Sequence, residues 1–191
     1  MKKAKRPAST LFTLISVAAV IIVMIFVTRS QQSNKEKEKS LEKLSEVDKM
    51  LEMNLDEEYP QTPREVAELH GNMTRLLYSG LKDEEIAGLA IMIRDLYDEE
   101  LIEINPEEQY LKDLYSDIAL WQQLDRRIEY SIIVNDNQEE IYSQDGRDYA
   151  TAFVSFTITE KGKTSRRRHY LMRKDKEGRW KILGWEEISK D

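Results

Sequence analysis

The chain has 191 residues, two histidines and no cysteine, and its acids outnumber its bases to give a net charge of −7. The lack of cysteine excludes disulfides, thiol chemistry, lipid attachment at a cysteine and a zinc site built from Cys and His. The length allows one domain with a hydrophobic core beside an N-terminal extension, and is too short for two such domains.

Charge is distributed unevenly along the chain. Residues 1–29 carry five bases and no acids, residues 30–159 carry 13 bases against 30 acids, and residues 160–191 carry 11 bases against six acids. The acidic middle argues against nucleic acid or anionic lipid as the main partner of that part.

An unbroken apolar run from Leu11 to Val27 follows a short basic leader. With its flanks, the run predicts a transmembrane helix over residues 11–28, about 30 Å long and sufficient to cross a bilayer core. A cleaved signal peptide is the competing interpretation, but the run is longer than a usual signal-peptide core and ends without a small-x-small cleavage site. We therefore expect an uncleaved signal anchor preceded by a cytoplasmic basic leader, residues 1–10.

The basic leader favours a cytoplasmic N-terminus, because a short basic segment is hard to export while long downstream regions are insensitive to charge counts. The sequence thus predicts a single-pass protein of the cell membrane with its C-terminal domain outside the cell. We expect a linker and an amphipathic stalk helix over residues 29–58, and an extracytoplasmic α+β domain over residues 59–191.

The stalk helix is predicted from apolar residues at spacings of three and four, namely Leu41, Leu44, Val47, Leu51 and Leu55. Packing of this stripe against its own domain is the simpler interpretation. A homodimer through the stalk is the alternative, although the stripe covers roughly two heptads where a coiled coil needs about 3–4.

Three further helices are predicted. The segment 62–65, Thr-Pro-Arg-Glu, has the pattern of a helix start with a capping box, and this helix runs to near Gly80. A second helix begins after Asp83, and a third opens at Asn105-Pro106, with asparagine as the cap and proline in the first turn. The residues expected to face the core share helical spacing: Val66, Leu69, Met73, Leu76 and Leu77; Ile86, Leu89, Ala90, Ile93 and Tyr97; and Leu111, Leu114, Ile118, Trp121 and Leu124.

After Arg127 the apolar residues alternate, which predicts strands. The first strand is marked by Ile128, Tyr130, Ile132 and Val134, and a short strand around Ile141-Tyr142 lies between turn signals at Asp136-Asn137 and Asp145-Gly146. The third, Tyr149–Thr159, has Ala150, Ala152, Val154, Phe156 and Ile158 on one face. Strands near Ser165–Arg173 and Trp180–Trp185 complete an antiparallel meander, with Trp180 buried and Arg179 and Lys181 exposed. The predicted fold is α+β, with three helices packed on a curved sheet.

Two resemblances add to this interpretation. The ending from Lys174 to Trp185, with Gly178-Arg179-Trp180-Lys181-Ile182, resembles the last hairpin of nuclear-transport-factor-2-like (SnoaL-like) cone domains. The segments around Tyr59–Val66, Leu76–Tyr78 and Asp98–Leu101 are similar to an uncharacterised family of single-span membrane proteins from Gram-positive Clostridia, which implies no known activity. Membrane-anchored cone domains also occur in the bitopic assembly component of type IV secretion machines.

The two histidines are the candidates for acid–base chemistry. His70 lies on the inner side of the first predicted helix, where packing at the core margin is the simpler interpretation, and His169 lies in a strand from which it could point into a cone cavity. The acid runs Asp83–Glu85 and Asp98–Glu100 are typical of solvated helix starts and ends. We assign no catalytic, cofactor-binding or metal-binding residue and expect no cofactor.

Residues 166–168 are three consecutive arginines. In a strand, Arg166 and Arg168 share one face and Arg167 shares the other with His169, so they form no continuous patch. We expect the basic tail to pair with helix acids such as Asp117 and Asp125, and the alternative is a polyanion-binding surface that includes Arg166, Arg168, Arg173 and Arg179.

The sequence favours a membrane-anchored, non-enzymatic extracytoplasmic interaction or assembly domain, whose partners are the membrane and an unidentified protein but not nucleic acid. The alternative is a small-molecule-binding or hydrolytic cone-fold domain at the cell surface. An open cavity holding His169 and an acid would favour the alternative, whereas a cavity filled by Trp180, Phe156 and Trp121 would favour the interaction domain.

Overall fold

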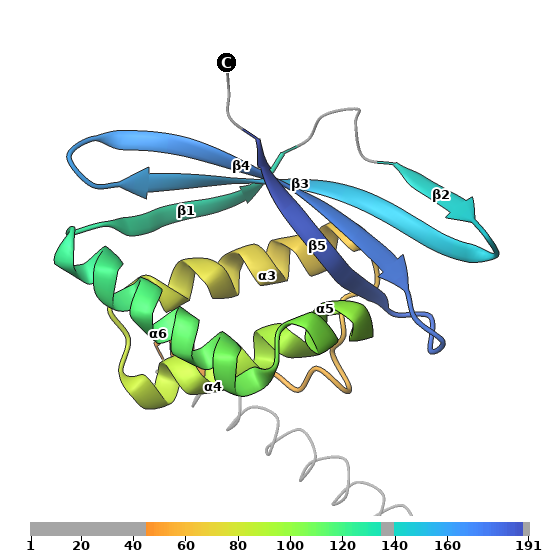
Figure 1. The fold of residues 1–191 in the computed structure, drawn as a ribbon, viewed down its shortest axis with the longest axis horizontal. Helices are drawn as coiled ribbons and strands as arrows, with labels where there is room; N and C mark the ends of the chain where they lie inside the picture. Colours follow the sequence, from red (N-terminus) through yellow and green to blue (C-terminus); the bar gives the residue numbers. More distant parts are fainter. Residues whose placement is uncertain (1–44, 135–139, 189–191) are drawn as a thin grey trace, which may run out of the picture. The chain divides into compact units, whose positions relative to one another are not determined.

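A computed structural model describes residues 45–134 and 140–188 (Figure 1). Residues from Glu46 onward belong to one compact unit. No helix in the described ranges is both long and apolar enough to cross a bilayer. The transmembrane helix predicted over residues 11–28 lies outside these ranges, as do Leu41, Leu44 and the Asp136-Asn137 turn.

In the described part of the chain, all helices precede all strands. The helices are α2 (Glu46–Leu51), α3 (Pro63–Leu77), α4 (Asp83–Asp95), α5 (Glu99–Ile104) and α6 (Glu107–Gln123), and the strands are β1 (Arg127–Ile133), β2 (Ile141–Gln144), β3 (Arg147–Thr159), β4 (Lys163–Lys174) and β5 (Trp180–Ile188). The predicted α+β class is confirmed.

The strands form one antiparallel sheet with the order β1-β3-β4-β5, and β2 pairs with the start of β3. The long β3 therefore carries β2 along its first half and β1 along its second. In Figure 1, α3, α4, α5 and α6 lie on one side of this sheet. We call the side that they cover the helix-facing side, and the opposite side the outer face.

The alternation predicted for β3 is confirmed by burial. Ala150, Ala152, Val154 and Phe156 are all buried on the helix-facing side. Their partners across β4 are Met172, Tyr170, Arg168 and Arg166 respectively. The register therefore points Arg168 and Tyr170 toward the helices, and Arg167 and His169 toward the outer face.

The capping box predicted at the start of α3 is confirmed. The Thr62 hydroxyl accepts from the Glu65 amide at 3.2 Å, and the Glu65 carboxylate accepts from the Thr62 amide at 3.0 Å. Further along α3, a Cβ atom on Gly71 would meet the Ser131 hydroxyl and lie 3.1 Å from Val154 Cγ1. Glycine at this position lets the helix approach the sheet closely.

The described part of the predicted stalk packs against the domain that follows it. Val47 and Leu55 are buried in the hydrophobic core. The Leu51 side chain lies against Gly88 in α4. Burial of apolar surface in this way agrees with packing onto the same chain.

The prediction of three helices after residue 59 is wrong, because α5 is an additional one in the described part. Asp98 caps it by accepting from the Glu100 amide at 3.0 Å, so the acid run at 98–100 starts a separate short helix. Asn105 ends α5, and Pro106 takes the N-cap position of α6. The expected asparagine cap is therefore also wrong. A six-residue helix with one buried side chain, Leu101, has no periodic stripe to reveal it.

The first strand departs from simple alternation. A register shift between Ile128 and Tyr130 marks a β-bulge, and Ile128 is buried whereas Tyr130 and Ile132 are exposed. Because a bulge inserts one residue, side chains two positions apart no longer share a face. The spacing that implies one shared face for Ile128, Tyr130 and Ile132 is misleading here.

Candidate functional site

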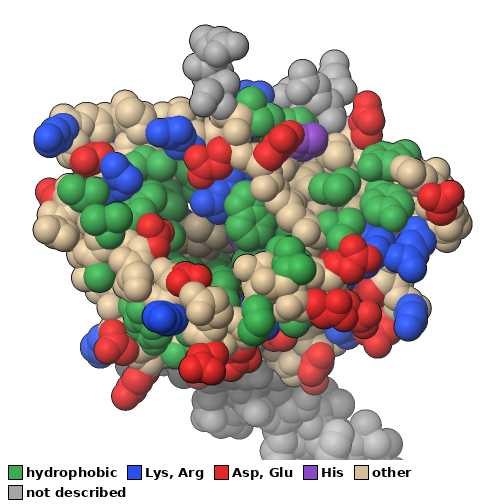
Figure 2. All heavy atoms as spheres, viewed as in Figure 1, with side chains coloured by type: hydrophobic (Ala, Val, Ile, Leu, Met, Phe, Trp, Pro, Cys, Tyr) green, Lys and Arg blue, Asp and Glu red, His purple; other side chains and the backbone are tan. Residues whose placement is uncertain are grey.

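Helix α6 packs less closely than α3 or α4. Of its residues predicted to face the core, Ile118 is buried, but Leu111, Leu114 and Trp121 are half-buried and Leu124, just past its end, is exposed. Figure 2 shows a hollow near the centre of this face, between α6 and the sheet, with basic and hydrophobic side chains at its walls. Five side chains on this side of the sheet, Tyr78, Tyr110, Trp121, Arg168 and Trp185, are linked by ring contacts, a cation–π contact and the charge of Arg168. We call this cluster the aromatic hollow.

Two wall residues come from the helix-facing side of the sheet. Trp185 pairs across strands with the fully buried Tyr170, yet it is 37 % exposed, because α6 does not close over it. The Arg168 guanidinium lies 4.9 Å from the Phe156 ring centroid and 5.5 Å from that of Trp185. Contact with the two ring faces fixes the cation in position by cation–π attraction.

The other walls are aromatic side chains from the helices. The rings of Tyr78 and Trp121 are 4.3 Å apart, and those of Tyr97 and Tyr110 are 6.3 Å apart with an edge-to-face arrangement. The Tyr97 ring also lies 5.9 Å from Trp185. Rings at these separations attract one another and present flat apolar surfaces to the hollow.

His70 lies beneath the hollow and is fully buried. Its Nδ1 atom is 2.9 Å from the Tyr170 hydroxyl, and its Nε2 atom is 3.5 Å from the Tyr97 hydroxyl. Burial, assisted by the charge of Arg168, lowers the pKa of His70 to about 3. The imidazole is therefore neutral at physiological pH. The expectation of packing at the core margin agrees with this burial.

The groups around His70 are neutral apart from Arg168. Each ring nitrogen of His70 faces a tyrosine hydroxyl, Nδ1 facing Tyr170 and Nε2 facing Tyr97. Burial raises the pKa of Tyr170 to about 12 and that of Tyr97 further, so both hydroxyls stay protonated.

The neutral state of His70 bears on chemistry. Its low pKa makes it a poor proton acceptor near neutral pH. His70, Tyr97 and Tyr170, which we call the floor of the hollow, are uncharged. They therefore do not neutralise the positive charge of Arg168. The aromatic hollow is therefore suited to binding an anion rather than to moving a proton.

His169 does not point into the hollow, so that interpretation is wrong. It stacks on Phe153 across the sheet, with ring centroids 4.3 Å apart, and its Nδ1 atom lies 3.1 Å from the Glu186 carboxylate. Both contacts are on the outer face. Because neighbouring residues of a strand point to opposite faces, Arg168 faces the helices while His169 faces outward. The charged side chain in the hollow is therefore Arg168.

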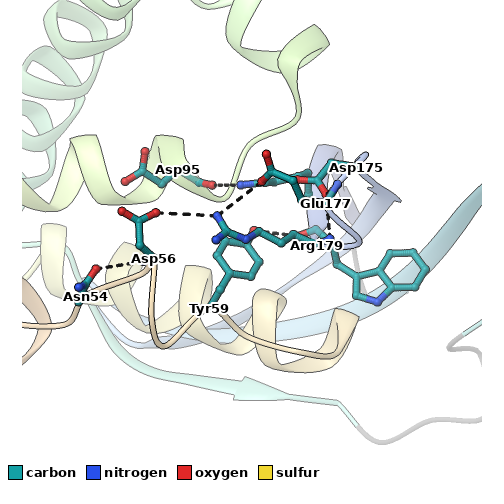
Figure 3. Close-up of polar contacts among 9 residues, drawn as sticks. Asn54, Asp56, Tyr59, Asp95, Asp175, Glu177 and Arg179 are labelled. Atoms are coloured by element: carbon teal, nitrogen blue, oxygen red, sulfur yellow. Dashed lines mark hydrogen bonds and ion pairs between the residues drawn. The ribbon is translucent and has the colours of Figure 1, made fainter.

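A second pocket lies where the loop after α2 meets the start of β5. Its volume is about 370 Å³, and Figure 3 shows Arg179 near Asp56, Glu177 and the Tyr59 ring. Arg179 and Lys181 lie 5.1 and 4.6 Å from the Tyr59 ring centroid, and both are half-buried. Their predicted large exposure is therefore wrong, whereas the predicted burial of Trp180 between them is confirmed.

The two cations of this second pocket have partners within the chain. Arg179 lies 3.9 Å from Asp56 and from Glu177, and Lys181 donates to the Asp95 carbonyl at 2.6 Å. The Tyr59 hydroxyl donates to the Trp180 carbonyl at 2.8 Å. The contacts of Tyr59 with Trp180, Arg179 and Lys181 hold the loop after α2 against β5. We call them the Tyr59 clasp.

Other bases of the tail also pair internally, as expected, but with different acids. Arg173 binds Asp98 at 2.5 and 3.0 Å and Glu100 at 2.7 Å. Asp117 instead accepts a hydrogen bond from Tyr78 at the edge of the aromatic hollow. Among residues 45–134 and 140–188, no group of three or more His, Asp or Glu side chains could hold a metal ion.

Sequence reasoning identified Arg168 and His70 but not the hollow that brings them together. The aromatic residues of the hollow, Tyr78, Tyr110, Trp121 and Trp185, are separated by 11 or more positions, and among them only Trp121 belongs to a predicted core stripe. One signal was present: Arg168 and Tyr170 share a strand face, and an arginine on a helix-facing side requires a polar or aromatic environment.

Comparisons with known proteins give limited information. No curated protein matches the sequence. The crystal structure of CagV, a VirB8 homologue of T4SS from Helicobacter pylori strain 26695, is 14 % identical and superimposes with a TM-score of 0.40, covering 66 % of this chain and 98 % of that one. At that TM-score the likeness supports no inference about this chain. A family model described as "Domain of unknown function (DUF6715)" matches residues 1–185, and the chain therefore belongs to that family.

Proposed function

We propose that the protein is a membrane-anchored, extracytoplasmic interaction domain that binds another protein without catalysing a reaction. The observation that carries this proposal is the exposed apolar surface of β1. Tyr130 and Ile132 are 60 % and 58 % exposed on the outer face. The anchor over residues 11–28 and the outward orientation rest on the sequence alone.

The position of these residues favours protein binding. β1 lies at an edge of the described sheet, where an unpaired backbone and exposed side chains can receive a partner strand. Leu171 and Ile188 add apolar surface on the same outer face. Exposed apolar and aromatic side chains at a sheet edge are typical of interaction surfaces.

Site-specific photo-crosslinking tests this proposal. A photoreactive phenylalanine analogue would replace Tyr130 or, as the matched control, Leu120, which is half-exposed on α6. The full-length protein would be irradiated in its native membrane. We expect a discrete adduct from position 130 and none from position 120. Equal labelling from both positions, or no adduct from either, would contradict the proposed surface.

The orientation requires its own test. Protease added to intact, wall-stripped cells should release the domain from its anchor, while a cytosolic control protein survives. Complete protection of the domain together with the control would show the reverse orientation.

A second function is supported by the aromatic hollow, which favours a small-molecule-binding domain of the nuclear-transport-factor-2-like cone type. The hollow combines apolar walls with a fixed cation, as ligand sites do. Binding is favoured over hydrolysis, because burial lowers the pKa of His70 to about 3 and makes it a poor proton acceptor. Titration of the full-length protein with a library of small organic acids, with no saturable binding of any of them, would exclude this function.

A further inference from the structure

We infer that the aromatic hollow binds a small aromatic carboxylate, and that Arg168 is the residue that holds the carboxylate. The inference rests on the second proposed function, a ligand-binding hollow, and adds the chemical class of the ligand.

Arg168 is positioned before any ligand arrives. The rings of Phe156 and Trp185 hold the guanidinium in place. A guanidinium offers a planar pair of donors that matches the two oxygens of a carboxylate. A fixed cation of this kind loses little conformational freedom on binding.

The charge of Arg168 is available to a ligand. Its ion-pair partner in the chain is Glu187 at 3.7 Å, on an exposed side chain. A pair at this distance and exposure is weak, so a ligand carboxylate can replace it. The floor offers no competing negative charge, because His70 is neutral and the Tyr97 and Tyr170 hydroxyls remain protonated.

The walls select an aromatic body for the ligand. The cluster offers several ring surfaces, from Trp185 beside Arg168 and from Tyr78 and Trp121, whose rings are tilted against each other 4.3 Å apart. A flat ring inserted between such surfaces gains offset-stacked and edge contacts, whereas a flexible aliphatic acid gains fewer and loses more rotational freedom. The carboxylate at one end of the ring would then reach Arg168.

The probes for this inference are naphthalene-2-carboxylate and its neutral isostere, naphthalene-2-carboxamide. Each would be titrated calorimetrically into the full-length protein in nanodiscs, with empty nanodiscs as the blank. We expect the carboxylate to bind roughly tenfold more tightly than the carboxamide, since a charge-assisted pair is about twice as strong as a neutral hydrogen bond. This comparison needs no variant, so it does not depend on a substitution that folds.

Variants then assign the carboxylate to its partner. Arg168→Gln should weaken binding of the carboxylate at least tenfold and leave the carboxamide nearly unchanged, and Arg168→Lys should restore part of the loss. The matched control is Arg166→Gln, on the same strand and the same face but exposed at the strand end, which should change either affinity less than twofold.

Three results would overturn the inference. Equal affinity for both probes would keep a ligand-binding hollow and remove the carboxylate preference. Binding of neither probe at solubility-limited concentrations would remove the proposed ligand-binding function as well. An Arg166→Gln effect as large as that of Arg168→Gln would indicate general attraction to a basic strand instead of a site at Arg168.

Discussion

The two ends of β5 differ in how far their tryptophan side chains are buried. At its start, Trp180 is enclosed beside the Tyr59 clasp, and both flanking cations lie over the Tyr59 ring. Toward its end, Trp185 faces the helices yet remains 37 % exposed. The difference separates a start of β5 whose enclosed aromatic surface stabilises the fold from an end whose aromatic surface stays accessible to solvent.

The largest effect is expected from truncating the enclosed tryptophan. Trp180→Ala should lower the free energy of unfolding by about 3–5 kcal/mol, because it removes a large side chain that is 5 % exposed and leaves a cavity. The matched control is Trp185→Ala, for which we expect a loss of about 1 kcal/mol, within the range for partly exposed positions. Denaturant unfolding monitored by far-UV circular dichroism measures both. We call the start of β5 at Trp180 the closed end and the part at Trp185 the open end. Similar losses of stability for the two variants would contradict this difference.

The next effect concerns the ion pair at the closed end. Arg173 and Asp98 have side chains 12 % and 5 % exposed. Asp98→Ala should cost about 3 kcal/mol, since it leaves a buried guanidinium without its main partner and removes the cap of α5. Glu100→Ala is the control, because Glu100 binds the same guanidinium from an exposed position and should cost only about 0–1 kcal/mol. If the two variants lose equal stability in urea titrations, the pair is not buried as described.

A pH effect is expected beneath the aromatic hollow. The pKa of His70 is about 3 in the folded chain and 6.5 at its ordinary value, so below pH 6.5 the unfolded chain takes up a proton that the folded chain does not. Stability from this group is therefore complete above pH 6.5 and is lost as the pH falls. The loss reaches about 2 kcal/mol at pH 5, at about 1.4 kcal/mol per unit.

Unfolding titrations at pH 7 and pH 5 test the His70 effect. His70→Gln should flatten the pH dependence, although it also lowers stability at both values by removing the bond to Tyr170. His169→Gln, on the outer face, is the matched control and should retain the steep dependence. A wild-type chain equally stable at both pH values would show that His70 can be protonated in the fold.

The smallest stability effect is expected on the outer face. Tyr130→Ser and Ile132→Ser should change the free energy of unfolding by less than about 0.5 kcal/mol, as surface substitutions usually do. Ile132→Ser should also abolish the photo-crosslinked adduct that the interaction proposal expects from position 130. A large loss of stability would mean that these side chains are covered by the rest of the chain.

Much of the closed end was predictable from sequence. The capping box at Thr62–Glu65, the buried alternation of β3 and the burial of Trp180 each follow from a local pattern that one element determines by itself. The Arg179 and Lys181 exposures were predicted wrongly because the Tyr59 ring that covers them lies about 120 residues away.

The open end was not predictable in the same way. The apolar spacing of α6 implies an inward face but does not determine how closely that face packs on the sheet, and here Trp121 remains half-buried. The bulge after Ile128 was not predicted, because it interrupts the alternation of the strand. Helix α5 was not predicted, because six residues are too few to show a helical period. The form of the site depends on the distance between helix and sheet, and the apolar spacing within one helix does not determine that distance.

The accessibility of Trp185 tests the central claim most directly. Protein labelled with 5-fluorotryptophan gives a separate ¹⁹F resonance for each of its three tryptophans, assigned by Trp→Phe variants. We predict that the Trp185 resonance shows a solvent isotope shift between H₂O and D₂O and moves on addition of naphthalene-2-carboxylate, while the Trp180 resonance does neither. A Trp185 resonance as insensitive as that of Trp180 to both solvent and ligand would show that the hollow is closed and would contradict the account.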